Sequence, residues 1–144
     1  MQDRYLFRGK RIDNGEWVIG NCIDDGVTGQ VFIHVVGNSV NESDKVGEEG
    51  CLQFVAFEVA PSTICQCTGL KDKNGNLIWE NDIMEAHLDD KFPEDATRTR
   101  VVWDKNAWVT NEPGAVDREY LDEFDTEHFY VIGNVFDDLE LLEG

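Results

Sequence analysis

The sequence is short of basic residues and has no long apolar run. Twelve Lys and Arg residues stand against 30 Asp and Glu residues in a chain of 144, which gives a formal net charge of −18. The apolar runs are only a few residues long, far below the roughly 20 that span a bilayer. No secretory h-region is visible near the start. No membrane association is therefore predicted, and the protein is expected in the cytoplasm.

Motifs that carry catalysis are also missing. The sequence contains no nucleophile elbow, no glycine-rich phosphate loop and no His-Glu-x-x-His helix. The three histidines, His34, His87 and His128, fall on separate predicted strands or strand edges. Acid pairs such as Asp24-Asp25 are better explained as solvated surface than as cation ligands in so acidic a chain. Enzyme activity is thus unsupported, and no catalytic residue, cofactor or metal is predicted.

Cysteine is present but gives little chemistry. The four cysteines, Cys22, Cys51, Cys65 and Cys67, are expected as thiols because disulfides are rare in reducing cytosol. Cys65 and Cys67 would share one face of a strand, which is a possible start for a zinc site. No second pair of ligands follows them at a suitable spacing, so a metal site is disfavoured.

The acidic residues are concentrated toward the C-terminus. Residues 61–144 carry a net charge of −13, and residues 117–143 hold ten acids against Arg118 alone. Such a surface repels phosphate, so direct nucleic-acid binding is not expected, and a basic protein partner, or none, is more consistent with it. The candidate interaction surface is formed by Asp122, Glu123, Asp125 and Glu127.

Short β-forming segments separated by turn residues dominate the pattern. This favours an all-β fold, with an SH3-like partly open barrel as the preferred architecture. The predicted strands are residues 5–7, 16–23, 30–36, 52–59, 83–88, 98–103, 107–110 and 129–136, with a bulge at Gly133. Residues 38–50 are predicted to form a loop. Residues 117–127 fit either a helix or an extended acidic loop, and residues 138–142 a terminal helical turn.

Two tight hairpins are predicted from turn chemistry. Asn74-Gly75 is the preferred pair for a type I′ turn, in which both central residues have positive φ. The segment Asp104-Lys105-Asn106 separates two strands that each carry a tryptophan, Trp103 and Trp108, and these are expected to anchor the second hairpin.

Four segments spread over nearly the whole chain carry a resemblance to a known family. They are Phe7–Lys10, Trp17–Gly20, Thr68–Gly75 and Val131–Phe136. The sequence resembles the YopX family of phage and prophage proteins in these segments. The resemblance implies a small β-barrel-like fold, a phage or prophage origin and no established biochemical activity. Asn81 stands where the family usually has glycine, and asparagine is the other residue that best tolerates a left-handed backbone.

The resemblance spans the chain as a single domain, residues 1–144, with a possible division into an N-terminal sheet (1–60) and a barrel (61–144). A structural role is favoured for five motif residues. Trp79 is expected to fill the interior and Asp82 to accept backbone hydrogen bonds beside a turn; the set is Gly69, Asn74, Gly75, Trp79 and Asp82.

Two functions remain open. The first is an uncharacterised phage-derived accessory protein that acts as a non-enzymatic interaction module, with strand edges that would allow a homo-oligomer. The alternative is an acidic DNA mimic that occupies the basic cleft of a host nucleic-acid-binding protein.

Overall fold

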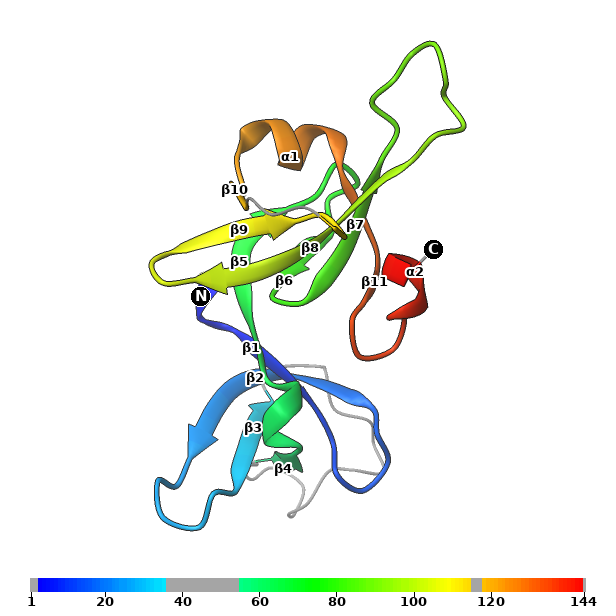
Figure 1. The fold of residues 1–144 in the computed structure, drawn as a ribbon. Coiled ribbons are helices and arrows are strands. Elements are labelled where there is room, and N and C mark those ends of the chain that lie inside the picture. The colour runs from blue at the N-terminus through cyan, green and yellow to red at the C-terminus, as the bar shows by residue number, and fades with distance from the viewer. Residues whose placement is uncertain (1–2, 36–54, 115–117, 144) are drawn as a thin grey trace. The chain divides into compact units, whose positions relative to one another are not determined.

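The chain forms two compact units, Met1–Gln66 and Cys67–Gly144 (Figure 1). The structure is a computed structural model that describes residues 3–35, 55–114 and 118–143. The change of unit falls at residues 66–67, six residues beyond the boundary expected from the sequence. Whether the two units behave as one domain stays a prediction.

The predicted all-β class is confirmed, and the strand pairs are antiparallel. In the described residues, the strands are β1 (Phe7–Lys10), β2 (Trp17–Asp24), β3 (Val31–Val35), β4 (Ala56–Val59), β5 (Cys65–Lys71), β6 (Leu77–Trp79), β7 (Asp82–Ala86), β8 (Thr97–Asp104), β9 (Ala107–Asn111), β10 (Glu119–Tyr120) and β11 (Tyr130–Asn134). The helices are α1 (Glu123–His128) and α2 (Glu140–Glu143), with short 3-10 turns η1 (Asp3–Tyr5) and η4 (Pro61–Thr63).

The first unit is built on the strand order β4-β3-β2-β1, followed by the first residues of β5. Alternation along β3 places Val31 and Ile33 on one face, where they pack with Val59 of β4. These three side chains are at most 7% exposed. Each contributes about 1.5–3 kcal/mol when fully buried, so this small cluster holds the sheet together.

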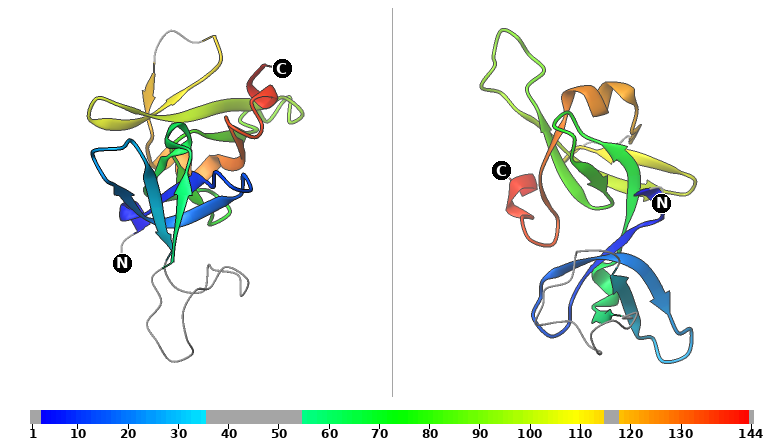
Figure 2. Two further views of the ribbon diagram at one scale, coloured as in Figure 1. Left: turned by 90° about the horizontal axis from the view of Figure 1, so that it is seen from below. Right: turned by 180° about the vertical axis from the view of Figure 1, so that it is seen from behind.

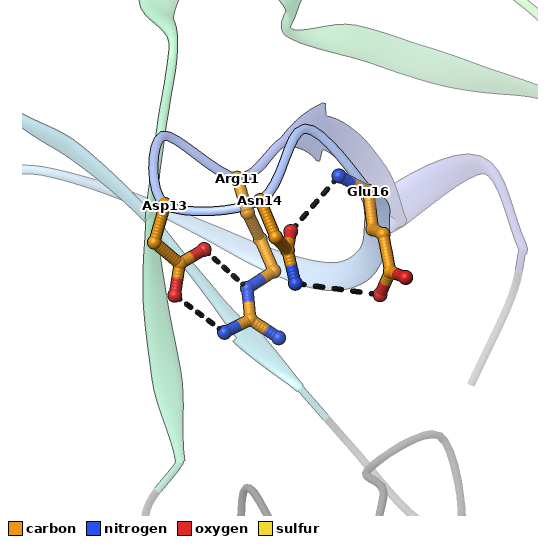
Figure 3. A network of polar contacts seen from close by, with 4 residues as sticks. All are labelled: Arg11, Asp13, Asn14 and Glu16. Atoms are coloured by element: carbon orange, nitrogen blue, oxygen red, sulfur yellow. Dashed lines mark hydrogen bonds and ion pairs between the residues drawn. The ribbon is translucent and has the colours of Figure 1, made fainter.

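The loop between β1 and β2 is fixed by the polar network drawn in Figure 3. Arg11 is only 9% exposed and forms a bidentate pair with Asp13, with Nε and Nη2 at 2.8 and 2.6 Å from the carboxylate oxygens. This hydrogen-bonded guanidinium lowers the pKa of Asp13. Asn14 accepts a hydrogen bond from the backbone N–H of Glu16 at 2.9 Å. The loop therefore has a defined conformation although most of it is exposed.

Gly20 of β2, the last residue of the family-like segment Trp17–Gly20, is a glycine for a steric reason. A Cβ at this position would meet the carbonyl oxygen of His34 on the neighbouring strand β3. Because that neighbour is backbone, it has no rotamer change with which to give way. Any larger residue would push β2 away from β3, so glycine is required by close approach.

The second unit contains a five-stranded sheet in the order β10-β9-β8-β7-β11, together with the β5–β6 hairpin. Its core joins β6, β7, β8 and the residue that precedes β11. The buried members are Ile78, Met84, Ala86, Val101 and Phe129. The connection between β7 and β8, residues 87–96, extends beyond this sheet in the views of Figures 1 and 2.

The β5–β6 hairpin exists, but its predicted type I′ turn is wrong. Among the described non-glycine residues only Asn81 and Lys105 have positive φ, so Asn74 does not. Instead the N–H of Gly75 donates to the carbonyl of Asp72 at 3.0 Å, and Gly75 has φ of 84°. This is the longer hairpin loop in which a β-turn is followed by a left-handed glycine.

Other sequence expectations hold with shifted boundaries. The β8–β9 hairpin forms with Trp103 opposite Trp108, and the bulge near Gly133 is present. The expected strand at residues 5–7 begins only at Phe7, after η1. The helix alternative for residues 117–127 is right only from Glu123 onward, after the short strand β10. The predicted loop at 38–50 and the start of the strand at 52 lie outside the described residues.

Candidate functional site

A pocket of about 350 Å³ opens in the second unit, between one face of strands β8 and β9 and helix α1. We name it the α1 pocket. In Figure 1, α1 follows β10 and leads into β11, which is how one short helix comes to lie beside the sheet. The lining residues are Leu88, Thr99, Thr110, Glu112, Glu119, Tyr120, Asp122, Phe124, Asp125 and Phe129.

Two threonines on neighbouring strands line the sheet side of the pocket. Thr110 of β9 is opposite Val101, and Thr99 lies two residues before Val101 on β8, so all three belong to the face that carries the core. The Thr110 hydroxyl donates to the Glu119 carbonyl at 3.4 Å. Thr99 is only 2% exposed, and its hydroxyl has no hydrogen-bond partner among the described residues.

Such a hydroxyl is costly. A buried polar group without a partner loses about 1–3 kcal/mol relative to its hydrated state. In native proteins most buried polar groups bond to the protein or to an ordered water, so the Thr99 hydroxyl is a candidate for contact with a water or a bound molecule.

The helix side of the pocket is organised by a capping box. The Asp122 carboxylate accepts from the backbone N–H of Asp125, and the Asp125 carboxylate accepts from that of Asp122, each at 3.2 Å. At the other end, the His128 ring stacks on Phe124 at 4.2 Å between centroids. These local contacts define α1, which has only six residues and no buried side chain.

The pKa of the Asp125 carboxyl group is raised in the folded chain. Partial burial is the largest cause that raises its pKa, to about 6, and the neighbouring carboxylates of Asp122 and Glu119 raise it further. The hydrogen bond from the Asp122 N–H acts in the opposite direction. The Asp125 carboxyl group therefore changes charge at about pH 6.

The outer part of the pocket combines acids with aromatic rings. Tyr120 is 71% exposed and Phe124 50% exposed. Glu112 and Glu119 are exposed acids on the same lining. No Lys, Arg or His is among the residues that line the pocket in the described part of the chain. Its chemistry is therefore anionic and aromatic.

The structure divides the predicted interaction surface into two pairs. Asp122 and Asp125 are engaged in the capping box and line the α1 pocket. Glu123 and Glu127 lie on the same helix, are exposed and do not line the pocket. That the four residues contact a partner stays a prediction.

The five motif residues lie in the segment from β5 to β7, and their structural role stays a prediction. Gly69 has φ of 82° at the irregular step between β5 and β6. Trp79 is 6% exposed. Its backbone N–H donates to the Asp82 carboxylate at 2.7 Å, as expected for an acid beside a turn. Asn74 and Gly75 are exposed residues of the hairpin loop.

Asn81 and Asp72 add to this motif. Asn81 has φ of 70°, so the left-handed backbone expected at this position is confirmed. Asp72 is 5% exposed; Oδ1 accepts from the N–H groups of Asn74 and Asn76, and Oδ2 accepts from that of Val131 at 2.8 Å.

The described histidines and cysteines fall in both units. His34 is on β3 of the first unit, whereas His87 and His128 are exposed residues of the second. Cys22, Cys65 and Cys67 carry thiols, and the last two are fully buried. Within the described ranges, no three His, Cys, Asp or Glu side chains gather closely enough to hold a metal ion. No helix in those ranges is long and apolar enough to cross a membrane.

The family is decided by a match of the YopX protein family model to residues 7–143. The chain belongs to the YopX family. A solved structure with a similar fold is the crystal structure of protein EF1440 from Enterococcus faecalis. The two chains are 21% identical, the aligned part covers 94% of this chain and 96% of the EF1440 chain, and the TM-score is 0.56. This likeness shows the fold alone. A search of curated proteins gave no match.

Sequence reasoning missed the sheet side of the pocket. The sequence predicts Thr99 and Thr110 only as strand residues, although each occupies a position of the core-facing set that contains Val101. A threonine at a position where strand alternation places an apolar residue was the available signal.

Proposed function

We propose that this YopX-family chain is a phage- or prophage-derived accessory protein that works as a non-enzymatic interaction module in the cytoplasm of its host. Its second unit binds a basic protein partner. The observation that carries the proposal is the gathering of acids and exposed aromatic rings around the α1 pocket. Exposed aromatic side chains next to charged groups are typical of protein recognition surfaces.

The charge distribution supports a basic partner. The chain carries a net charge of −18, and a field of one sign accelerates encounter with a molecule of the opposite sign. The same field opposes phosphate backbones, which argues against direct binding of nucleic acid. Complementary charge chiefly sets the association rate and the choice of partner.

The raised pKa of Asp125 has a structural cause and does not require a catalytic role. A carboxyl group with a pKa near 6 is a candidate acid or base in an enzyme. Here the Asp125 carboxyl group caps α1, and its pKa is raised by partial burial and by two neighbouring acids. Binding therefore accounts for the pocket with fewer assumptions than catalysis does.

The test is capture from a host lysate followed by reconstitution. The full chain is immobilised, and proteins that remain at low salt but are lost at moderate salt are identified by mass spectrometry. A purified basic protein that rebinds with a strong salt dependence supports the proposal. Recovery of the bait alone, or of partners that are insensitive to salt, contradicts it.

A DNA mimic is the second candidate, and exposed Glu123 and Glu127 on α1 favour it. In that case the carboxylates would stand in for phosphates, and duplex DNA would compete with the chain for the same partner. The double variant Glu123→Gln/Glu127→Gln tests this reading without removing the capping box. Loss of binding in this variant, together with competition by DNA, favours the mimic over the module.

A further inference from the structure

The α1 pocket combines three features that together specify a ligand. The first is the buried Thr99 hydroxyl on its sheet side, which has no hydrogen-bond partner among the described residues. This oxygen has less than 1 Å² of accessible surface, so a ligand N–H would reach it after rotation about the Cα–Cβ bond of Thr99, a residue that lines the pocket. The burial of Thr99, at 2% exposure, separates this feature from an ordinary surface hydroxyl.

The second feature is uncompensated negative charge. Four carboxylates line the pocket, those of Glu112, Glu119, Asp122 and Asp125. The cation nearest in sequence is Arg118, next to Glu119, and its guanidinium pairs with Asp104 at 3.4 Å instead. The pocket lining thus offers acceptors and negative charge to a ligand that brings a positive charge and several N–H donors.

The third feature is the arrangement of these acids around a space much larger than an ion. The pocket measures about 350 Å³, and no three acids in the described residues come together as metal ligands. Tyr120 and Phe124 present exposed rings at the same place. A planar guanidinium stacks on aromatic rings and donates hydrogen bonds in several directions, which an ammonium group does less well.

We propose that the α1 pocket is a receptor for a single arginine side chain of a basic partner, with Thr99 as the acceptor on the sheet side and the acids and rings around the guanidinium. This inference rests on the proposed function, because it names the residue of the partner that the second unit recognises. Such an arginine acts as an anchor, the role in which buried Arg is enriched at protein interfaces.

The first test uses a defined probe. The peptide acetyl-Gly-Arg-Gly-amide is titrated into the full chain and followed by amide chemical shifts, with the citrulline peptide as a neutral isostere and the lysine peptide as a second cation. The arginine peptide is expected to shift the amides of Thr99, Thr110 and Asp125 and to bind about tenfold more tightly than the citrulline peptide. Equal binding of the two, or shifts located elsewhere, overturns the inference.

Matched variants locate the site. Glu112→Gln/Glu119→Gln and Glu123→Gln/Glu127→Gln remove the same charge, but only the first pair lines the pocket. The first variant is expected to bind the arginine peptide about tenfold more weakly than the natural chain, and the second less than about twofold more weakly. Thr99→Val removes the hydroxyl, keeps the β-branched shape and is expected to weaken binding several-fold without loss of the native amide spectrum.

The outcomes separate the inference from the function beneath it. If a captured basic partner binds both double variants equally, the arginine pocket is wrong while the interaction module stands. If the arginine peptide fails to bind and no salt-sensitive partner is recovered, both are wrong. Tighter binding of the lysine peptide than of the arginine peptide also rejects the assignment of a guanidinium.

Discussion

The Asp72 carboxylate connects the β5–β6 hairpin to β11. It is 5% exposed and accepts three backbone hydrogen bonds, two within the hairpin loop and one from Val131. Because β11 is distant in sequence, this side chain joins a local turn to the tertiary structure. The hairpin segment of the family-like sequence is thus explained by structure.

Replacing Asp72 tests that explanation. Asp72→Ala leaves three backbone donors without their acceptor and is expected to lower the free energy of unfolding by about 3 kcal/mol. Urea denaturation measures the change. The control is Asp89→Ala, which removes an exposed carboxylate whose hydrogen-bond donor among the described residues is the Lys91 N–H, and it is expected to cost less than about 1 kcal/mol. Equal costs for the two variants would contradict the connecting role.

Asp125 makes stability depend on pH in an unusual direction for an acid. Its pKa is raised in the folded chain to about 6, from an ordinary value of 3.8. The protonated form is favoured by folding, so its contribution to stability is complete below the ordinary pKa. That contribution is lost as the pH rises through about 6.

The variant Asp125→Asn keeps an oxygen that accepts the Asp122 N–H but cannot ionise. The free energy of unfolding of the natural chain, minus that of the variant, is expected to fall between pH 4 and pH 6.5, roughly the interval set by the two pKa values. Urea denaturation at several pH values measures it. A difference that is constant or rises with pH would show that the carboxyl titrates in its ordinary range.

At the scale of elements, helix α1 depends on its cap more than on packing. It has six residues and buries none of them, whereas Asp122 and Asp125 close a capping box at its start. Isolated helices of this length are unstable in water. The helix side of the α1 pocket is accordingly positioned by two carboxylates.

Removing the cap should loosen α1 selectively. Asp122→Ala is expected to cost about 1 kcal/mol and to accelerate hydrogen exchange of residues 125–129 while leaving the β7–β8 amides protected. Hydrogen exchange followed by mass spectrometry or NMR reports both regions. Glu123→Ala, which removes an exposed acid from the same helix, serves as the control and is expected to leave the exchange of α1 nearly unchanged. Similar acceleration in both variants would argue against the cap.

Elements set by local chemistry were predictable from the sequence. The β8–β9 hairpin follows from turn residues between two β-forming runs, and the left-handed Asn81 follows from its side chain. The turn at Asn74-Gly75 was mispredicted because the Asp72 carboxylate accepts from both Asn74 and Asn76 and holds a longer loop.

The α1 pocket was only half predictable. The acids at 122–127 were visible as a cluster, but their division into capping and exposed pairs depends on where α1 begins. Thr99 and Asp125 meet across one pocket only because β8 and α1 are brought together by the fold. No local pattern encodes that meeting, so sequence reasoning treated Thr99 as an ordinary strand residue.

For the whole molecule, the strongest physical property is its charge. The net charge is −18. The acidic side chains therefore repel one another, and this repulsion is stronger in the compact folded state than in the expanded unfolded chain. Raising the salt concentration from about 50 to about 300 mM screens this repulsion. The Tm is expected to rise by about 2–4 °C, which corresponds to about 1 kcal/mol for a chain of this size.

Differential scanning calorimetry measures this effect. The control is a variant with several exposed acids outside the α1 pocket changed to glutamine, for example at Asp90, Glu94 and Glu127, whose Tm is expected to respond less to salt. A Tm that falls with salt would mean that attractive ion pairs, such as Arg98 with Glu85, outweigh the repulsion.

The edges of the five-stranded sheet bear on self-association. One edge strand, β10, has only two residues, and the other, β11, is interrupted by an irregular register at Gly133. Short and bulged edges are the devices by which sheets avoid strand addition. A homo-oligomer therefore stays a prediction, and this sheet would join it through side chains more readily than through added strands.

The two tryptophans of the β8–β9 hairpin give the molecule an optical signature. Trp103 and Trp108 lie edge to face with ring centroids 5.0 Å apart and an interplanar angle of 69°, close enough for their electronic transitions to couple. Coupled indole rings produce a paired positive and negative band in circular dichroism that single rings do not. Because this hairpin carries Thr99 and Thr110, its ellipticity provides a label-free signal of whether the strands beside the α1 pocket remain paired when a ligand is added.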